Sequence, residues 1–205
     1  MLITGFAAGS ADANCYFAAP GPGAAAVVVD PGDEVVQTLE YYFAANDLTP
    51  AAVLLTHGHA RHTASVHDLC LGWEVPVYIH PADRHLLGEL ELGEPDEVVE
   101  IADGDVLELA GVAVAVDHTP GHTEGSVVFR ISADTDEGPA EVAFTGDTLL
   151  CRGIGTGDRA TLLSSIARKL LVLGDDTVVL PGHGTSTTIG AERRFNPLLK
   201  DLRAS

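Results

Sequence analysis

The chain has 205 residues, 46% of them hydrophobic, and carries a formal net charge of −19 with only two lysines. A chain of this length and hydrophobic content can bury a full core, and we expect a single domain over residues 1–205. The strong negative charge argues against nucleic acid and anionic membranes as partners, because both repel an acidic surface.

Two further features bear on the compartment. The sequence has no run of 18 apolar residues, and its N-terminus lacks a basic segment ahead of an apolar stretch. Its three cysteines are widely spaced and odd in number, which is typical of free thiols in a reducing environment. We therefore expect a cytoplasmic protein without a membrane span, as a monomer or homodimer.

Glycine and proline divide the first fifty residues into short strands and one helix. Strands are expected near residues 2–6, 14–18 and 24–29, as an antiparallel meander. Asp33 is placed to cap an amphipathic helix that runs to about Asn46. A crossover then leads to a buried, parallel-type strand at residues 51–55.

Helices and strands alternate along the rest of the chain. Further helices are expected at about 63–71, 81–87, 160–173 and 191–203, and further strands at 75–79, 105–109, 112–117, 126–132, 141–144 and 177–180. Acidic, solvated loops are expected at 88–97 and 134–138. Four strands end in a His or Asp flanked by glycine, and glycine lets the backbone turn sharply, so that these ends can converge on one point.

Three imidazoles lie within six positions directly after the strand at 51–55. In an extended loop, residues two apart point the same way, so His57 and His59 can bind one ion while His62 reaches a neighbouring point. Isolated histidines in polar loops are common, but this spacing is typical of metal ligands. The loop also lies at the carboxyl end of a parallel-type strand, where open α/β sheets bind ligands.

Four motifs together resemble the metallo-β-lactamase superfamily, and within it the glyoxalase II-like hydrolases. They are HxHxxH at 57–62, TPGHT at 119–123, FTGDT at 144–148 and PGHG at 181–184. The resemblance covers about residues 2–183. It implies an α/β fold, namely an αββα sandwich of two mixed β-sheets with helices on both outer faces.

The resemblance also implies a ligand set for two metal ions. The first zinc would be bound by His57, His59 and His122. The second would be bound by His62 and His183, with Asp147 bridging both ions. Asp30 resembles the family's first motif and is expected to be structural. His118 is expected to hydrogen-bond a ligand or a carbonyl near the site.

These residue types define the chemistry independently of the family. A zinc ion held by three neutral imidazoles keeps a position for water and lowers its pKa toward ~7, so hydroxide exists at neutral pH. We expect a metal-dependent hydrolase that acts on an ester or thioester of a small-molecule acyl substrate, with Asp147 and metal-bound water at the reaction centre. One or two zinc ions are expected, and iron and manganese also fit the ligand types.

Arg61 stands where the family pattern H-x-H-x-D-H has an aspartate that binds the second metal. A guanidinium has five donors and no acceptor, so it cannot bind a cation and should weaken the second site. Three interpretations stay open. In the first, Arg61 points to solvent and the second site keeps a weakly bound metal. In the second, Arg61 occupies the second site and pairs with Asp147 or binds a substrate carboxylate. In the third, the metal site has decayed and the protein is not catalytic. We favour the second.

The substrate is less constrained. Glyoxalase II proper has a C-terminal helical domain that binds glutathione, but only 22 residues follow His183, so we expect poor hydrolysis of S-lactoylglutathione. Thr156 stands where glyoxalase II-like chains carry an arginine, for which Arg152 is a candidate replacement. The alternative to a hydrolase is a non-hydrolytic relative, either a mononuclear iron enzyme like the superfamily's persulfide dioxygenases or a metal-poor binding protein.

Overall fold

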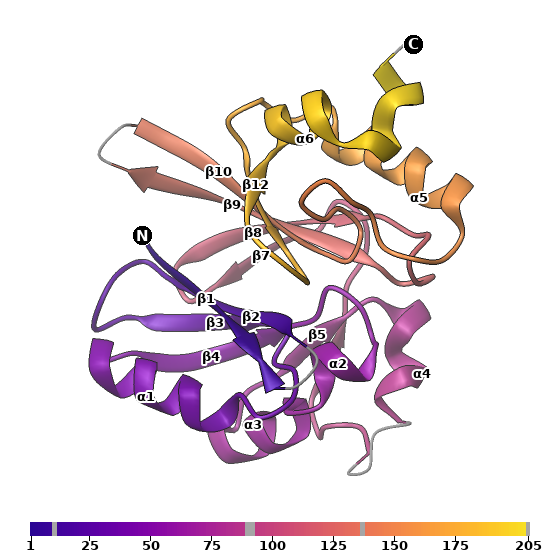
Figure 1. Cartoon of the computed structure of the whole chain (residues 1–205). Coiled ribbons are helices and arrows are strands. Elements are labelled where there is room, and N and C mark those ends of the chain that lie inside the picture. The colour runs from indigo at the N-terminus through magenta and orange to yellow at the C-terminus, as the bar shows by residue number, and fades with distance from the viewer. Residues whose placement is uncertain (10–11, 89–92, 136–137, 204–205) are drawn as a thin grey trace.

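Two six-stranded sheets lie face to face at the centre of the molecule (Figure 1). The computed structural model describes residues 1–9, 12–88, 93–135 and 138–203. The first sheet has the order β1 (Leu2–Ala8), β2 (Ala13–Ala19), β3 (Ala25–Val29), β4 (Thr49–Leu54), β5 (Val77–Ile79), β6 (Val98–Glu100). The second has the order β12 (Thr187–Thr188), β11 (Val178–Pro181), β10 (Gly138–Gly146), β9 (Val127–Thr135), β8 (Val112–His118), β7 (Val106–Leu109).

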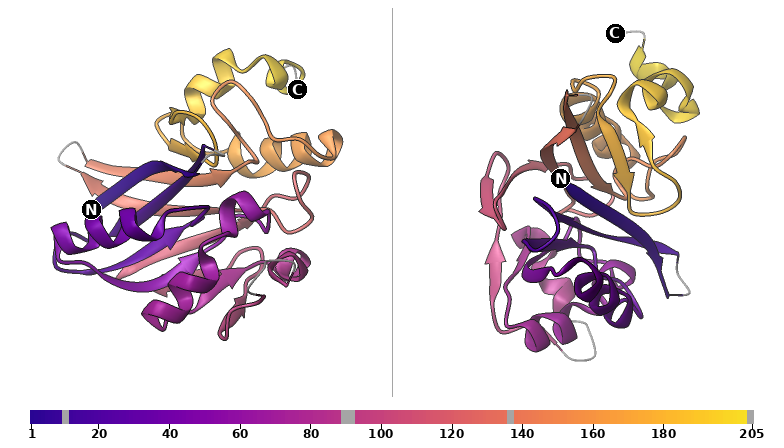
Figure 2. Two further views of the ribbon diagram at one scale, coloured as in Figure 1. Left: turned by 60° about the horizontal axis from the view of Figure 1, so that its bottom comes forward. Right: turned by 90° about the vertical axis from the view of Figure 1, so that its left-hand side faces the viewer.

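Helices cover the outer faces of both sheets, as two further views show (Figure 2). The helices that belong to the first sheet's half of the molecule are α1 (Val36–Asn46), α2 (Ala60–Thr63), α3 (Val66–Trp73) and α4 (Arg84–Leu87). The second carries α5 (Arg159–Ser165), a π-helical stretch (Ile166–Leu170), α6 (Ile189–Phe195) and a 3-10 helix (Pro197–Arg203). Among the helices that the structure describes, none is long and apolar enough to span a membrane.

The alternation of side chains along each strand explains this layering. In β3, Val27 belongs to the core between the sheets, together with Phe129 from β9, whereas Val28 points outward and packs with Leu39 of α1. The outer face of the second sheet packs against α5 and α6 in the same way. The expected αββα sandwich is therefore confirmed.

Strand direction brings the predicted ligand loops to one edge. The antiparallel meander β1–β2–β3 is confirmed, and β4 runs parallel to both β3 and β5. In the second sheet β10 runs parallel to β11, so Asp147 and His183 follow neighbouring strand ends. The first sheet reaches across to this edge: Asn14 Nδ2 and the Tyr16 hydroxyl both donate to the carbonyl of Pro181, at 2.9 and 2.7 Å.

Helix boundaries are where the sequence-based expectations were wrong. Asp33 does not cap α1, because Glu34 adopts a left-handed conformation (φ 56°) and the helix begins after Val35. The expected helix at 63–71 is two helices, because the backbone departs from helical geometry at Ser65 (φ −95°, ψ 4°), whose N–H donates to the carbonyl of Pro31.

The C-terminal helix expected at 191–203 is also broken. Pro197 has no N–H and disfavours the helical conformation of the residue before it, so Asn196 is extended (φ −69°, ψ 116°) and α6 ends there. The short strands β6 and β12 were not expected. Residues 89–92 and 136–137 of the two expected acidic loops lie outside the described residues.

Candidate metal centre

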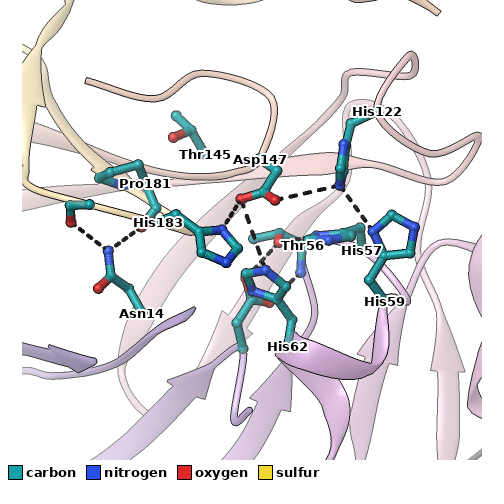
Figure 3. A network of polar contacts seen from close by, with 12 residues as sticks. Asn14, Thr56, His57, His59, His62, His122, Thr145, Asp147, Pro181 and His183 are labelled. Atoms are coloured by element: carbon teal, nitrogen blue, oxygen red, sulfur yellow. Dashed lines mark hydrogen bonds and ion pairs between the residues drawn. The ribbon is translucent and has the colours of Figure 1, made fainter. Parts of the chain in front are cut away.

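The six predicted ligands converge at the edge where β4, β8, β10 and β11 end (Figure 3). His57 and His59 lie in the loop after β4, and His62 lies in α2 directly behind it. The other three follow strands of the second sheet: His122 after β8, Asp147 after β10 and His183 after β11. The structure divides them into two adjacent sets of three.

The first set consists of His57, His59 and His122, whose ligand atoms all lie within 4.8 Å of one another. His59 Nδ1 and His122 Nε2 are 3.0 Å apart. Two nitrogens that bind one tetrahedral zinc at 2.0–2.1 Å are about 3.3 Å apart. Two ring nitrogens this close need a proton or a metal ion between them, and the geometry fits an ion.

Hydrogen bonds at the back of two rings determine which nitrogen is free. The Thr56 hydroxyl donates its one hydrogen to Asp30 Oδ2 at 2.6 Å, so it must accept from His57 Nδ1 at 3.0 Å. His122 Nδ1 likewise donates to the carbonyl of Thr156 at 2.9 Å. Each ring therefore keeps a lone pair on Nε2, and His57 Nε2 is buried without a hydrogen-bond partner.

The second set consists of His62, Asp147 and His183. Asp147 Oδ1 lies 2.8 Å from His183 Nδ1 and 3.9 Å from His62 Nε2, whereas Oδ2 lies 3.6 Å from Nε2 of His122 in the first set. Figure 3 shows this carboxylate between the two groups of imidazoles. Nε2 of His62 and Nε2 of His183 are buried without hydrogen-bond partners, as expected for atoms that bind a metal.

The two sets differ in how readily they take up protons. Burial and the neighbouring imidazoles, His62 first among them, lower the pKa of His57 far below its ordinary value. Burial lowers the pKa of His62 too, but the carboxylates of Asp30 and Asp147 outweigh it, so that this pKa is raised. His57 therefore stays neutral, and able to bind a cation, to lower pH than His62 does.

Asp30 lies behind the ligands. Its two oxygens accept from the backbone N–H of Thr56 at 2.8 Å and from the Thr56 hydroxyl. Oδ2 is also 3.3 Å from His62 Nδ1, close enough for an ion pair but without hydrogen-bond geometry. Both oxygens are thus engaged in holding the loop that carries the HxHxxH motif, the arrangement of a structural carboxylate.

A cavity of about 470 Å³ opens over both sets, lined by His59, Ala60, Arg61, His62, His122, Asp147, Thr156 and His183. Arg61 is exposed and, within the described part of the chain, forms no ion pair; Asp147 faces only imidazoles. Arg61 thus does not pair with Asp147. Arg152 is not part of the lining, and its guanidinium lies 6.0 Å from the ring centroid of Phe195.

The ligand loops approach one another so closely that two positions admit only glycine. A Cβ on Gly182 would lie 2.5 Å from Asp147 Oδ1 and 2.8 Å from His62 Cε1. A Cβ on Gly155 would lie 2.9 Å from His122 Nδ1. Side chains at these positions would push the ligands apart.

Some contacts escaped the sequence-based reasoning. Thr56 has no role in the sequence-based expectations, although a hydroxyl directly before a candidate ligand histidine is a usable signal. Asp83, which contacts both loops of the first set, has no motif around it. His118 does meet a carbonyl, that of Glu124 at 2.9 Å.

In a His183→Ala background, which removes a ligand of the second set, we expect the double variant His59→Ala/His122→Ala to lose metal uptake, because one imidazole of the first set remains. Metal that binds only the folded state stabilises it by about 2.7 kcal/mol at 100 times the Kd, so the rise in Tm on adding zinc should also vanish. Native mass spectrometry and thermal denaturation measure both. The exposed His85→Ala is the matched control. Unchanged metal content in the double variant would contradict the assignment.

We also expect acid to release metal in a fixed order. Because the pKa of His62 is raised, its proton competes with the metal at a higher pH than the ordinary 6.5, whereas His57 resists protonation to lower pH. Protein saturated with excess zinc should lose the second ion first as the pH falls from about 8 to about 5. Native mass spectrometry over this range checks the order, and loss of both ions in a single step would contradict it.

Comparison with known proteins agrees with the geometry. Residues 9–183 match the model of the metallo-beta-lactamase superfamily. An uncharacterized protein of Mycobacterium tuberculosis is 51% identical over 98% of this chain and 99% of its own length. The hydroxyacylglutathione hydrolase GloC of Haemophilus influenzae is 37% identical over 85% of this chain and 87% of its own length.

Solved structures show the same likeness. The BLEG-1 B3 metallo-beta-lactamase superposes with a TM-score of 0.83 at 32% identity, covering 97% of this chain and 100% of that one. ETHE1 from Myxococcus xanthus gives 0.81 at 29% identity (96% and 84%), and TTHA1623 in a di-iron-bound form gives 0.80 at 34% identity (96% and 100%). The fold, the two sets of His and Asp side chains and these matches together show that the chain belongs to the metallo-beta-lactamase superfamily.

Proposed function

We propose that the protein is a metal-dependent hydrolase that acts on the thioester or ester bond of a small-molecule acyl substrate. The observation that carries this proposal is the first set, in which three imidazoles bring ring nitrogens together beside an open cavity that His59 and His122 line. A divalent ion held by three neutral imidazoles lowers the pKa of bound water toward ~7 and so supplies hydroxide at neutral pH. Zinc is the ion we propose.

Asp147 is the residue that we propose to act on the reacting water. Its Oδ2 faces the first set and its Oδ1 the second, so one carboxylate can accept a hydrogen bond from water at the first set while it also serves the second. A carboxylate within hydrogen-bond reach fixes the direction in which the nucleophile approaches a carbonyl carbon. Thr56 and Thr156, which hold the rings of His57 and His122 from behind, keep the acceptor nitrogens directed at this point.

Arg61 is the only lysine or arginine among the residues that line the cavity. A guanidinium within ~4 Å of a second divalent ion would cost on the order of several kcal/mol at an effective dielectric constant near 20. We therefore propose that Arg61 does not lie against a second metal ion but binds an anionic group of the acyl substrate, for which its planar pair of donors is suited. Its exposure and lack of an ion-pair partner among the described residues support this role.

Whether the protein hydrolyses glutathione thioesters can be tested directly by assay. The expectation of poor S-lactoylglutathione hydrolysis came from the short stretch after His183. GloC is named a hydroxyacylglutathione hydrolase and matches this chain over 87% of its own length. The short stretch after His183 is therefore a weak argument against a glutathione thioester as substrate. We therefore propose a thioester substrate and include glutathione thioesters in the test.

A mononuclear iron enzyme is the second candidate, because His62, His183 and Asp147 supply the two imidazoles and one carboxylate that suit Fe(II). The similar structure in a di-iron-bound form makes iron a metal to test for here. Metal analysis of protein purified without chelator separates the candidates: zinc supports the hydrolase, iron the alternative, and no metal a binding protein.

We expect purified, zinc-loaded protein to hydrolyse at least one acyl thioester or activated ester, with the rate lost on chelation and regained on adding zinc. The substrate panel contains neutral acyl thioesters, carboxylate-bearing thioesters and S-lactoylglutathione. The rate of hydrolysis is measured as the release of free thiol. Hydrolysis that persists in chelator, or none on any member by zinc-loaded protein, would contradict the proposed function. A fastest rate on S-lactoylglutathione would show that the expectation from the C-terminus was wrong.

Arg61→Asp and Arg61→Ala separate the two effects of the arginine. Both remove the positive charge near His62, but only the aspartate adds a ligand, so zinc content should rise toward two ions per chain in Arg61→Asp and less in Arg61→Ala. Both variants should lose activity on carboxylate-bearing thioesters relative to neutral ones by about 10- to 100-fold, the value of a charged hydrogen-bonded pair. Equal metal content and equal substrate preference in all three proteins would show that Arg61 controls neither.

A further inference from the structure

Asp83 is a buried carboxylate close to the first set that is not itself a candidate ligand. It lies in the 3-10 turn (Pro81–Asp83) after β5 and is 1% exposed. Within the described residues it forms no ion pair with an arginine or lysine. An ionised carboxylate without a cationic partner is held in place by the donors that surround it.

All of those donors come from the two loops that carry the first set. Asp83 Oδ2 accepts from the backbone N–H of Gly58 at 2.9 Å and from the Thr123 hydroxyl at 2.7 Å, and Oδ1 accepts from the N–H of Gly125 at 2.8 Å. Gly58 lies between His57 and His59, and Thr123 directly follows His122. One carboxylate thus joins a loop of the first sheet to a loop of the second.

The packing around Asp83 is as close as its hydrogen bonds. A Cβ on Gly125 would lie 2.6 Å from Asp83 Cγ, and a Cβ on Gly58 would lie 2.9 Å from the Asp83 carbonyl oxygen. The Thr123 hydroxyl, which gives its hydrogen to Asp83, accepts in turn from Ser126 Oγ at 2.7 Å. The two loops therefore close directly on Asp83, with no room for a side chain between them.

Among the described residues the two loops are also joined where the Val127 N–H donates to the carbonyl of Thr56 at 2.8 Å, next to the ends of β9 and β4. In the part of the chain that the structure describes, the His59 ring has no hydrogen-bond partner except His122. The place of His59 is thus set by its backbone, which Asp83 holds through the adjacent Gly58.

We propose that Asp83 is a positioning residue of the metal centre: its carboxylate sets the separation of the His59 and His122 loops and thereby the geometry of the first metal site. Metal–nitrogen distances tolerate shifts of only about 0.2 Å, so a small opening between the loops weakens binding. This inference rests on the metal of the proposed function, but it requires no hydrolytic activity and is tested without it.

Asp83→Asn tests the proposal, because the amide replaces one acceptor with a donor that faces N–H and O–H groups. Co²⁺ is titrated into metal-free protein in a His183→Ala background, which leaves the first set as the binding site, and visible absorption reports affinity and geometry. Asp83→Asn should bind Co²⁺ about 10- to 100-fold more weakly, the usual effect of losing an outer partner of a ligand, with an altered absorption spectrum.

Glu192→Gln is the matched control. Glu192 is also 1% exposed and accepts from the N–H of Arg152 at 2.9 Å, from Asn196 Nδ2 at 2.8 Å and from the Thr187 hydroxyl at 2.8 Å, but it touches no candidate ligand. Both variants should lower the Tm of the metal-free protein, because each disturbs a buried network. Only Asp83→Asn should change Co²⁺ affinity, which a merely structural role would leave unchanged.

Co²⁺ affinity in Asp83→Asn equal to that of Glu192→Gln would overturn the proposal. If Asp83→Asn does not fold, Thr123→Val removes the hydroxyl contact with Asp83 and keeps the side-chain shape; weaker binding then supports the proposal and parental affinity overturns it. A parent protein that binds no Co²⁺ would instead contradict the metal site of the proposed function, a result distinct from equal binding by both variants.

Discussion

The first set depends on keeping the buried His57 imidazole uncharged, with one ring nitrogen tied to a fixed partner and the other free. Thr56 illustrates this, because its hydroxyl donates its one hydrogen to Asp30 and can therefore only accept a hydrogen bond from His57. A buried nitrogen without a partner costs about 1–3 kcal/mol, and the Nε2 atoms of His57, His62 and His183 are all of this kind. A bound cation offsets this cost, so the fold stores part of the metal-binding energy in advance.

Three aspartates give the site its shape, each at a different depth. Asp30, at the end of β3, holds the HxHxxH loop through Thr56, and Asp83 holds that loop against the loop of His122. Asp147 alone faces the cavity, between the two sets. The two buried carboxylates accept from backbone and hydroxyl donors, whereas the third is the one that we propose to act on metal and water. Among the described residues that line the cavity, Arg61 is the one lysine or arginine.

Local signals explain what could be predicted from the sequence. The four glycine-flanked His or Asp positions follow strand ends, so their convergence was predictable, whereas the division into two ligand sets came from the family resemblance. Contacts made by residues without a motif were not: Asp83 is 25 residues from Gly58 and 40 from Thr123 in the chain. The break at Pro197 was readable in principle, since proline disfavours a helical residue before it.

Anomalous X-ray diffraction at the zinc absorption edge, from crystals grown with zinc and no chelator, tests the central claim most directly. A strong peak is predicted within about 2.0–2.1 Å of a ring nitrogen of each of His57, His59 and His122. A weaker peak beside His62, Asp147 and His183 would agree with the charge of Arg61 nearby. Zinc bound only elsewhere on the molecule, with the three imidazoles free of metal, would contradict the account.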